Sequence, residues 1–333
     1  MMDSHEFEVD FYLSDKILKQ LQITENFGIF KSSESKILQQ LALKNYDLVI
    51  IGTVHRYFST FYKIVERYNT SVIVHNTNFG SLSKFQLFKK IFRKDFPYRL
   101  KLFLEEGLMK APNVHRKAGN LLVLDKALLQ GNYKFITVFF NKFSGNKSND
   151  HLTLVIPGAV SQSRRDYRHV LKKLEELRHK NLNQKIRIVL LGKIQGEELS
   201  WFHSFDELSL QNIELEYFTE KVPQEVFDFW MNNADVLWCP IQNETEFFST
   251  KEIYGTTKMT GNIGDAIKYG KPAVFPSSYT QNYEFIINEN ENLWEQFLNM
   301  KQAGFPGLKS FEKDKISAHL HHKLRELITF QNS

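Results

Sequence analysis

The chain has 333 residues, of which 42% are hydrophobic and 24% charged, and its formal net charge is +5. This length predicts two domains of about 150 residues each, and the ordinary balance of apolar and charged residues excludes a largely disordered chain. The single cysteine, Cys239, excludes an intrachain disulfide and a cysteine-based metal cluster, and no apolar run is long enough to span a bilayer.

The first half of the chain alternates short β-branched or aromatic runs with helical patterns. Four runs have the composition of strands: 7–13, 47–52, 71–74 and 120–124. Between the second and third runs, residues 57–68 carry apolar side chains at helical spacing, as a crossover between parallel strands requires. The pattern predicts a parallel α/β lobe, which we assign to residues 1–147.

A polar stretch with glycine and serine, 141–150, marks the expected boundary between two lobes. After it the alternation restarts, with strands predicted at 152–156, 186–191, 236–240 and 273–276 and helices at 166–180, 223–232 and 262–269. We assign the second lobe to 148–308 and a helical tail to 309–333. Two lobes of this kind place ligands in a crevice at the carboxyl ends of their strands.

The most informative segment is 254–278, in which a glycine-containing loop opens a short helix and Gly-Lys-Pro leads into an apolar strand. Gly261 allows close backbone approach, and the amides of Asn262 and Ile263 at the helix start are expected to be free to bind phosphate oxygens. Asp265 either accepts hydrogen bonds from ribose hydroxyls or only favours the helix dipole. The segment therefore predicts a diphosphate site.

A second group of candidates follows the strand at 152–156, where Pro157 and Gly158 end the strand and a polar loop carries Arg164 and Arg165. Two guanidinium groups facing the crevice would neutralise a leaving diphosphate without a metal. Alternatively, the arginines pair with Asp166 or Glu175 of the following helix. No metal is expected, because the sequence contains no Asp-x-Asp.

Three motifs together resemble retaining GT-B glycosyltransferases of the family-four type: IPG at 156–158 before the arginine loop, LLGK at 190–193, and GDAIKYGKPAVFP at 264–276. The similarity spans 152–277. It implies a GT-B fold, with two Rossmann-like βαβ lobes facing each other across a cleft, and a nucleotide-diphosphate sugar as donor. It also implies that Asp265 takes the place of a ribose-binding glutamate and that Gly158 and Gly192 belong to the donor site.

The sequence departs from the family pattern at Thr257 and Lys258, where the family has an acidic residue that contacts the donor sugar. Lys258 is expected to reach the phosphates instead, and Glu252 is a second candidate for the sugar contact. In the first lobe, His75 follows the strand at 71–74. By the resemblance it contacts the transferred sugar, with a loop-bracing histidine as the alternative. The catalytic candidates are thus His75 and Lys258.

The family also opens with a strand and a glycine-rich loop, whereas no glycine follows residues 8–11 here, so the first strand of the lobe is expected to be missing.

The stretch from Lys84 to Lys101 has seven basic residues and one acid, Asp95, so its local charge is seven minus one, or +6. Helical spacing places four apolar side chains on one face: Phe85, Phe88, Ile91 and Phe92. This pattern predicts either contact with an anionic membrane surface or a helix whose apolar face packs on its own lobe. Nucleic acid is not an expected partner, because the sequence lacks a broad basic face with interleaved stacking aromatics.

The resemblance implies a metal-independent, retaining glycosyltransferase of hexosyltransferase type that needs no cofactor. It would transfer a sugar from a nucleotide-sugar donor to a glycan or lipid-linked acceptor in the synthesis of cell-surface polysaccharide. The alternatives are a GT-B-like sugar-nucleotide epimerase and a catalytically inactive glycosyltransferase-like partner subunit. The acidic first ten residues do not resemble a signal peptide, so we expect a cytoplasmic location, peripheral on the inner face of the membrane.

Overall fold

The computed structural model describes residues 6–24, 28–142, 151–178, 184–207, 212–280, 282–305 and 308–329. The chain divides into two compact units, described separately below. Unit 1 comprises Met1–Leu124, Leu129–Ile136 and Ser317–Ser333, and unit 2 comprises Asp125–Leu128 and Thr137–Ile316. Most of the boundary segment predicted at 141–150 lies outside the described residues.

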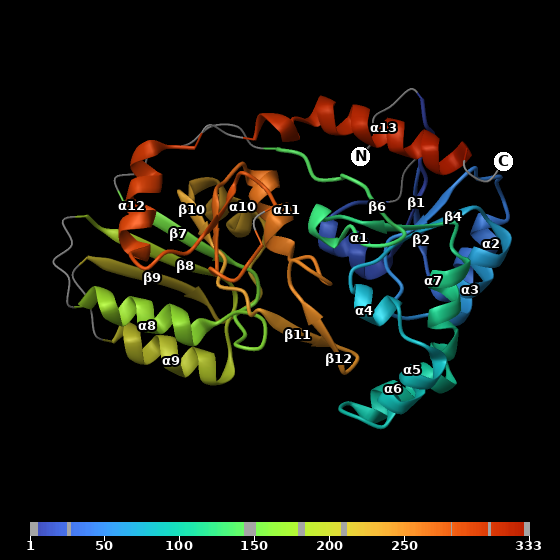
Figure 1. Ribbon diagram of the computed structural model, residues 1–333, viewed down its shortest axis with the longest axis horizontal. Helices are drawn as coiled ribbons and strands as arrows, with labels where there is room; N and C mark the ends of the chain where they lie inside the picture. The colour runs from blue at the N-terminus through green and yellow to red at the C-terminus, as the bar shows by residue number, and fades with distance from the viewer. Residues whose placement is uncertain are drawn as a thin grey trace. The chain divides into compact units, whose positions relative to one another are not determined.

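Unit 1 contains two parallel sheets and the helices that accompany them (Figure 1). Its elements are β1 Phe11–Ser14, α1 Asp15–Leu21, β2 Ile29–Ser32, α2 Glu34–Leu41, β3 Val49–Ile51, α3 Phe58–Arg67, β4 Thr70–Ile73, α4 Thr77–Gly80, α5 Lys84–Ile91, α6 Phe96–Leu104, α7 Ala111–Lys117, β5 Asn120–Val123, β6 Tyr133–Phe135 and, from Ser317 onward, α13 Lys313–Thr329.

The main sheet of unit 1 has the strand order β3-β4-β5-β6, and all of its pairs are parallel. The crossover helix predicted between the second and third strands is confirmed as α3. The strand predicted at 7–13 is the shorter β1, which pairs with β2 in a separate two-stranded sheet and does not join the main one. Leu320 and Leu327 of α13 pack with Leu122 and Ile136, so the end of the chain completes the core of this unit.

The stretch from Lys84 to Lys101 forms two helices, and the residues predicted to share an apolar face lie on and next to the first of them. Helix α5 ends at Ile91 and α6 begins at Phe96, because Asp95 adopts a left-handed conformation with φ of 62° and Pro97 stands in the first turn of α6. Of the four residues predicted to share an apolar face, only Ile91 is buried, together with Leu87. No helix in the described part of the chain is both long and apolar enough to cross a bilayer.

Unit 2 is a single large parallel sheet with helices on both faces and a β-hairpin beside it (Figure 1). Its elements are β7 Leu152–Pro157, α8 Tyr167–Arg178, β8 Ile186–Lys193, α9 Gly196–Asp206, β9 Ile213–Phe218, α10 Gln224–Asn233, β10 Val236–Trp238, β11 Glu244–Phe247, β12 Thr250–Ile253, α11 Gly261–Tyr269, β13 Ala273–Phe275, β14 Ile286–Asn288 and α12 Leu293–Ala303.

The strand order of the unit 2 sheet is β9-β8-β7-β10-β13-β14, the order of a doubly wound dinucleotide-binding sheet. Alternate residues of the central strands point to opposite faces, as the two-residue period of a strand requires. Leu154 and Ile156 of β7 join the core under α8, α9 and α12, whereas Val155 joins the core under α10 and α11. A strand buried on both faces is largely apolar, which is why β7 could be recognised in the sequence.

Candidate functional site

A pocket of about 320 Å³ in unit 2 lies where the segments that follow β7 and β10 meet the start of α11. Strand β7 has β8 on one side and β10 on the other, so the chain's direction of winding reverses between β7 and β10. Open α/β sheets bind ligands at such a switch point, beyond the carboxyl ends of the strands. The pocket is lined by Gly158, Ala159, Arg164, Arg165, Ile241, Tyr254, Lys258, Met259, Thr260, Gly261, Asn262 and Asp265.

The pocket brings together most of the predicted site residues, and leaves out three. Gly192 and Ile263 belong to unit 2 but do not line the pocket, and His75 belongs to unit 1. The side chain of Ile263 is 1% exposed and packs in the core on the α10–α11 face of the sheet.

The loop after β7 holds Arg165 against its own backbone. Gly158 has a φ of +101°, a conformation that favours glycine, and the guanidinium group lies close to it: a Cβ atom there would be 2.5 Å from Arg165 Nη2. Arg165 Nη1 donates to the Ala159 carbonyl at 3.2 Å and Nη2 donates to Asn262 Oδ1 at 3.3 Å. Its buried Nε has no hydrogen-bond partner among the described residues.

The alternative in which Arg164 and Arg165 pair with acidic residues of the next helix is not what the structure shows. Within the described residues, neither arginine forms an ion pair with Asp166 or Glu175. Arg164 is exposed and Arg165 is partly buried, and both line the pocket. Their charges are therefore available to a ligand in it.

The start of α11 is capped by its own chain. Thr260 Oγ1 accepts a hydrogen bond from the amide of Asn262, and the Thr260 carbonyl accepts one from the amide of Ile263, both at 3.4 Å. The expectation that these two amides are free is therefore wrong, although both bonds are long. The Asn262 side chain is 1% exposed and donates to the Pro157 carbonyl at 3.2 Å, so it joins the end of β7 to the helix.

Gly261 is an open position of the pocket wall. It is exposed, and nothing lies within 4 Å of a Cβ atom built on its backbone. Its backbone can thus be approached closely by a ligand, as the sequence predicted.

Lys258 places a third cation in the pocket. Burial lowers the pKa of its ammonium group, Glu252 opposes this effect, and the positive charge of Arg164 lowers the pKa further. Glu252 is fully buried on β12 and does not line the pocket, so its proposed contact with a donor sugar finds no support. The repulsion between Lys258 and Arg164 is reduced when an anion binds between them.

Asp265 is the only acid among the described lining residues. Burial raises its pKa to about 6, while Arg165 limits the rise. At neutral pH the carboxylate is therefore mostly ionised and can accept hydrogen bonds from hydroxyl groups. No group of three or more His, Cys, Asp or Glu side chains within the described part of the chain is arranged to hold a metal ion.

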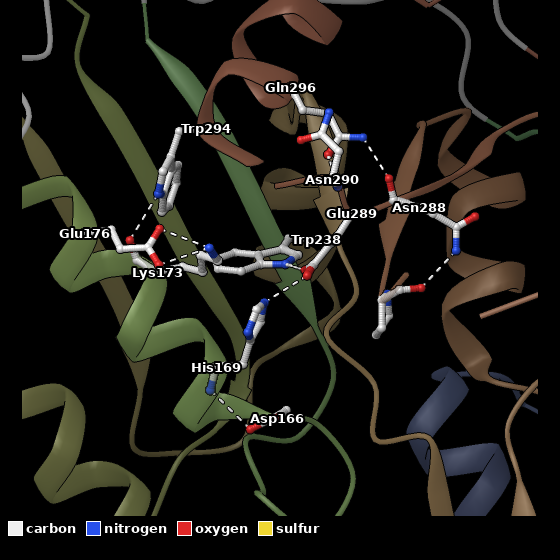
Figure 2. A network of polar contacts seen from close by, with 11 residues as sticks. Asp166, His169, Lys173, Glu176, Trp238, Asn288, Glu289, Asn290, Trp294 and Gln296 are labelled. Atoms are coloured by element: carbon white, nitrogen blue, oxygen red, sulfur yellow. Dashed lines mark hydrogen bonds and ion pairs between the residues drawn. The ribbon is translucent and has the colours of Figure 1, made fainter. Parts of the chain in front are cut away.

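A polar network fixes the helix that follows the arginine loop (Figure 2). Glu289 accepts a hydrogen bond from Trp238 Nε1 at 2.7 Å, and its other oxygen lies 2.8 Å from His169 Nε2. The His169 amide donates to Asp166 Oδ1 at 3.1 Å, so the first turn of α8 is tied to the ends of β10 and β14. We interpret Glu289, His169 and Asp166 as residues that position the loop carrying Arg164 and Arg165.

This network predicts a pH-dependent stability. The hydrogen bond to Glu289 raises the pKa of His169. Its contribution to stability is therefore complete below the unfolded histidine pKa of about 6.5 and is lost as pH rises through the higher folded value. As pH rises from the unfolded pKa through and above the folded one, the wild type should therefore lose Tm relative to Glu289→Gln. Thermal melts of both proteins across that range test this, and parallel curves would contradict it.

His75 lies at the carboxyl edge of the main sheet of unit 1. Its Nε2 is 2.8 Å from the Gly52 carbonyl, and its ring meets the His55 ring edge-on at 6.0 Å. Gly52 follows β3 and His75 follows β4, so the imidazole is at the strand-end position that the sequence predicted. The contact with Gly52 is also the loop-bracing role given as the alternative.

Gly192 has a packing role in the structure. A Cβ atom at this position of β8 would lie 2.3 Å from the Gly158 carbonyl oxygen and 2.8 Å from the Ala159 nitrogen. The absence of a side chain lets β8 approach the loop that forms one wall of the pocket.

Five lining residues were missed from the sequence: Ala159, Ile241, Tyr254, Met259 and Thr260. Thr260 carried a signal, because threonine immediately before a helical pattern is a common N-cap. The other four carried none, since single apolar residues in a loop have no periodicity that points to a pocket.

No protein-family model and no curated protein matches the sequence. Among solved structures, the chain is similar to sucrose-phosphate synthase from Thermosynechococcus elongatus, with 11% identity and a TM-score of 0.53 over 90% of this chain and 78% of that one. It is similar to the GtfA/B complex, with 10% identity and a TM-score of 0.52 over 90% of this chain and 61% of that one. It is also similar to TarM from S. aureus, with 14% identity and a TM-score of 0.46 over 91% of this chain and 57% of that one.

The chain spans about three fifths of the length of the GtfA/B and TarM chains. The likeness at these low identities shows the fold alone, and it confirms the predicted α/β fold of GT-B type, in which both units carry parallel sheets.

Proposed function

We propose that the chain is a glycosyltransferase that binds a nucleoside-diphosphate sugar in the unit 2 pocket and transfers the sugar to a glycan or lipid-linked acceptor. One observation carries the proposal: Arg164, Arg165 and Lys258 line a single pocket at the switch point of a doubly wound sheet. A ligand with two phosphates matches this concentration of positive charge.

The arrangement has a direct use in sugar transfer. When the bond between the sugar and the diphosphate breaks, negative charge grows on the leaving phosphate oxygens. Fixed cations at that point stabilise the transition state more than the ground state, and Arg165 is held in place by two hydrogen bonds. In this proposal Gly261 allows close approach of the diphosphate, Asp265 accepts hydrogen bonds from the ribose, and Asn262 holds the helix start against β7.

The finer features of the proposal rest on the sequence resemblance. They are a retaining, metal-independent transfer of a hexose, a role for His75 near the transferred sugar or the acceptor, and a place in cell-surface polysaccharide synthesis on the cytoplasmic side of the membrane. The fold likeness to sucrose-phosphate synthase and the GtfA/B complex supports the general class.

A thermal-shift screen with nucleoside diphosphates tests the donor site. A ligand at about 100 times its Kd should raise the Tm by about 5–10 °C, because binding stabilises only the folded state. Arg164→Gln should lose most of this shift, whereas Arg168→Gln, an exposed arginine four residues later that does not line the pocket, should keep it. No shift with any nucleoside diphosphate, or equal shifts for both variants, would refute the assignment of the pocket.

A second candidate function is a glycosyltransferase-like subunit that binds the donor without turnover. It is favoured by Lys258 standing where the family has an acid, and by Asp265 being the only acid in the described pocket wall. Donor hydrolysis or transfer, assayed as release of the nucleoside diphosphate, separates the two functions: binding without release indicates the subunit. An epimerase would need further carboxylates, and would convert the sugar without releasing the nucleotide.

A further inference from the structure

Helices α5 and α6 of unit 1 expose a concentration of large apolar side chains, here called the α5–α6 surface. Among the described residues, six of the fourteen exposed large apolar side chains lie on it: Phe85, Phe88, Phe92, Phe96, Tyr98 and Leu104. Their exposed fractions range from 40% for Phe96 to 68% for Leu104. Single exposed apolar residues need no explanation, but a contiguous group marks a surface that contacts something else.

The α5–α6 surface is built as a fixed hairpin. Leu87 and Ile91 anchor α5 in the core with at most 1% exposed, and Arg99 of α6 is 4% exposed and donates Nη1 to the Lys90 carbonyl at 2.5 Å. The exposed rings also contact each other, since the Phe92 ring centroid is 5.4 Å from that of Phe88 and 5.8 Å from that of Phe96. The two helices lie side by side in Figure 1, away from the strands of their unit.

Positive charge borders the aromatic rings. Lys84, Lys89, Arg93 and Lys94 are all exposed, and within the described residues none of them forms an ion pair with an acidic side chain. Lys89 lies over the ring of Phe85, with its Nζ 4.3 Å from the centroid. Basic groups around exposed rings match a lipid bilayer with anionic headgroups at its surface and apolar chains beneath them.

We propose that the α5–α6 surface docks on an anionic membrane. The phenyl rings enter the interfacial region, and the lysine and arginine side chains meet the lipid phosphates. A second copy of the chain fits less well as occupant, because two surfaces with a local charge of +6 would repel each other. The proposal does not depend on the identity of the ligand in unit 2.

Vesicle co-sedimentation of the full chain tests the proposal, with phosphatidylcholine vesicles that either lack phosphatidylglycerol or contain about one third of it. We expect binding only to the anionic vesicles. Lys89→Glu with Lys94→Glu should weaken this binding by at least about tenfold, because each basic residue near an anionic membrane adds to the attraction and each new glutamate is repelled. Phe85→Ser with Phe92→Ser should weaken it by at least about tenfold as well, since both rings are lost from the interface.

Matched controls come from the same unit. Lys16→Glu with Lys36→Glu reverses two exposed charges elsewhere, and Leu43→Ser removes a side chain that is 86% exposed. Both should bind vesicles like the wild type, and all variants should melt like it, because the altered side chains are exposed. Equal binding to neutral and anionic vesicles, equal loss in the controls, or dimers that Phe85→Ser with Phe92→Ser dissolves would each overturn the proposal.

Discussion

Gly261→Val should abolish the thermal shift caused by a nucleoside diphosphate while leaving the fold intact. The protein itself has room for the new side chain, because nothing lies within 4 Å of a Cβ atom at this position. The residue is at the first position of α11, where valine costs a helix only about 0.5 kcal/mol relative to a good helix former. The loss should therefore come from the ligand, which can no longer approach the backbone.

The measurement is the Tm with and without the best nucleoside diphosphate. Gly261→Ala should retain part of the shift, since its side chain is smaller. Gly52→Val is the matched control, because Gly52 also has open space around a built Cβ atom and no left-handed conformation, and it belongs to unit 1. A Gly261→Val protein that melts like the wild type and keeps the full shift would exclude this face of the pocket as the binding surface.

Gly192→Ala should be strongly destabilising, although it adds only one carbon. The new Cβ atom would lie 2.3 Å and 2.5 Å from the carbonyl oxygen and carbon of Gly158. These are backbone atoms and cannot rotate away, so β8 and the loop after β7 must separate. Overpacking of this kind costs about 3 kcal/mol. The Tm should fall by roughly 6–12 °C, using the usual shift per kcal/mol for a domain of this size.

Calorimetric or fluorescence melts measure this effect, with Gly52→Ala as a control that should melt within about 2 °C of the wild type. Because the displaced loop carries Gly158 and the arginines, Gly192→Ala should also weaken nucleotide binding in whatever fraction remains folded. An unchanged Tm would mean that the two backbone segments are not in contact.

The parts of the fold and site that were predictable from sequence share one property: each has a local sequence pattern that is compatible with few other structures. Strand β7 is apolar on both faces, and α11 has an N-cap and a following Gly270 in the left-handed conformation that commonly ends a helix. That Arg164, Arg165 and Lys258 lie at one site was predictable, because parallel strands end at the same edge of a sheet.

What was missed depends on contacts between distant residues or on unusual backbone. The β11–β12 hairpin turns at Phe248 and Ser249, with φ of 54° and 51°, and neither residue type signals such a turn. Asp95 also adopts a left-handed conformation, between α5 and α6, which the helical spacing of the basic stretch did not reveal, although Pro97 was a signal for a helix boundary there. The partners of the Asn262 and Ile263 amides were missed although Thr260 carried an N-cap signal, because the helix start was expected to be uncapped.

The residues of α13 that complete the unit 1 core have a consequence for biosynthesis. The chain leaves the ribosome from its amino terminus, and domains generally fold as they emerge. Here Leu320 and Leu327, which pack on Leu122 and Ile136, are translated after all of unit 2. We therefore expect unit 2 to reach its native state before unit 1. Until α13 has been translated, the core of unit 1 is incomplete, and that unit should remain accessible to proteases and chaperones.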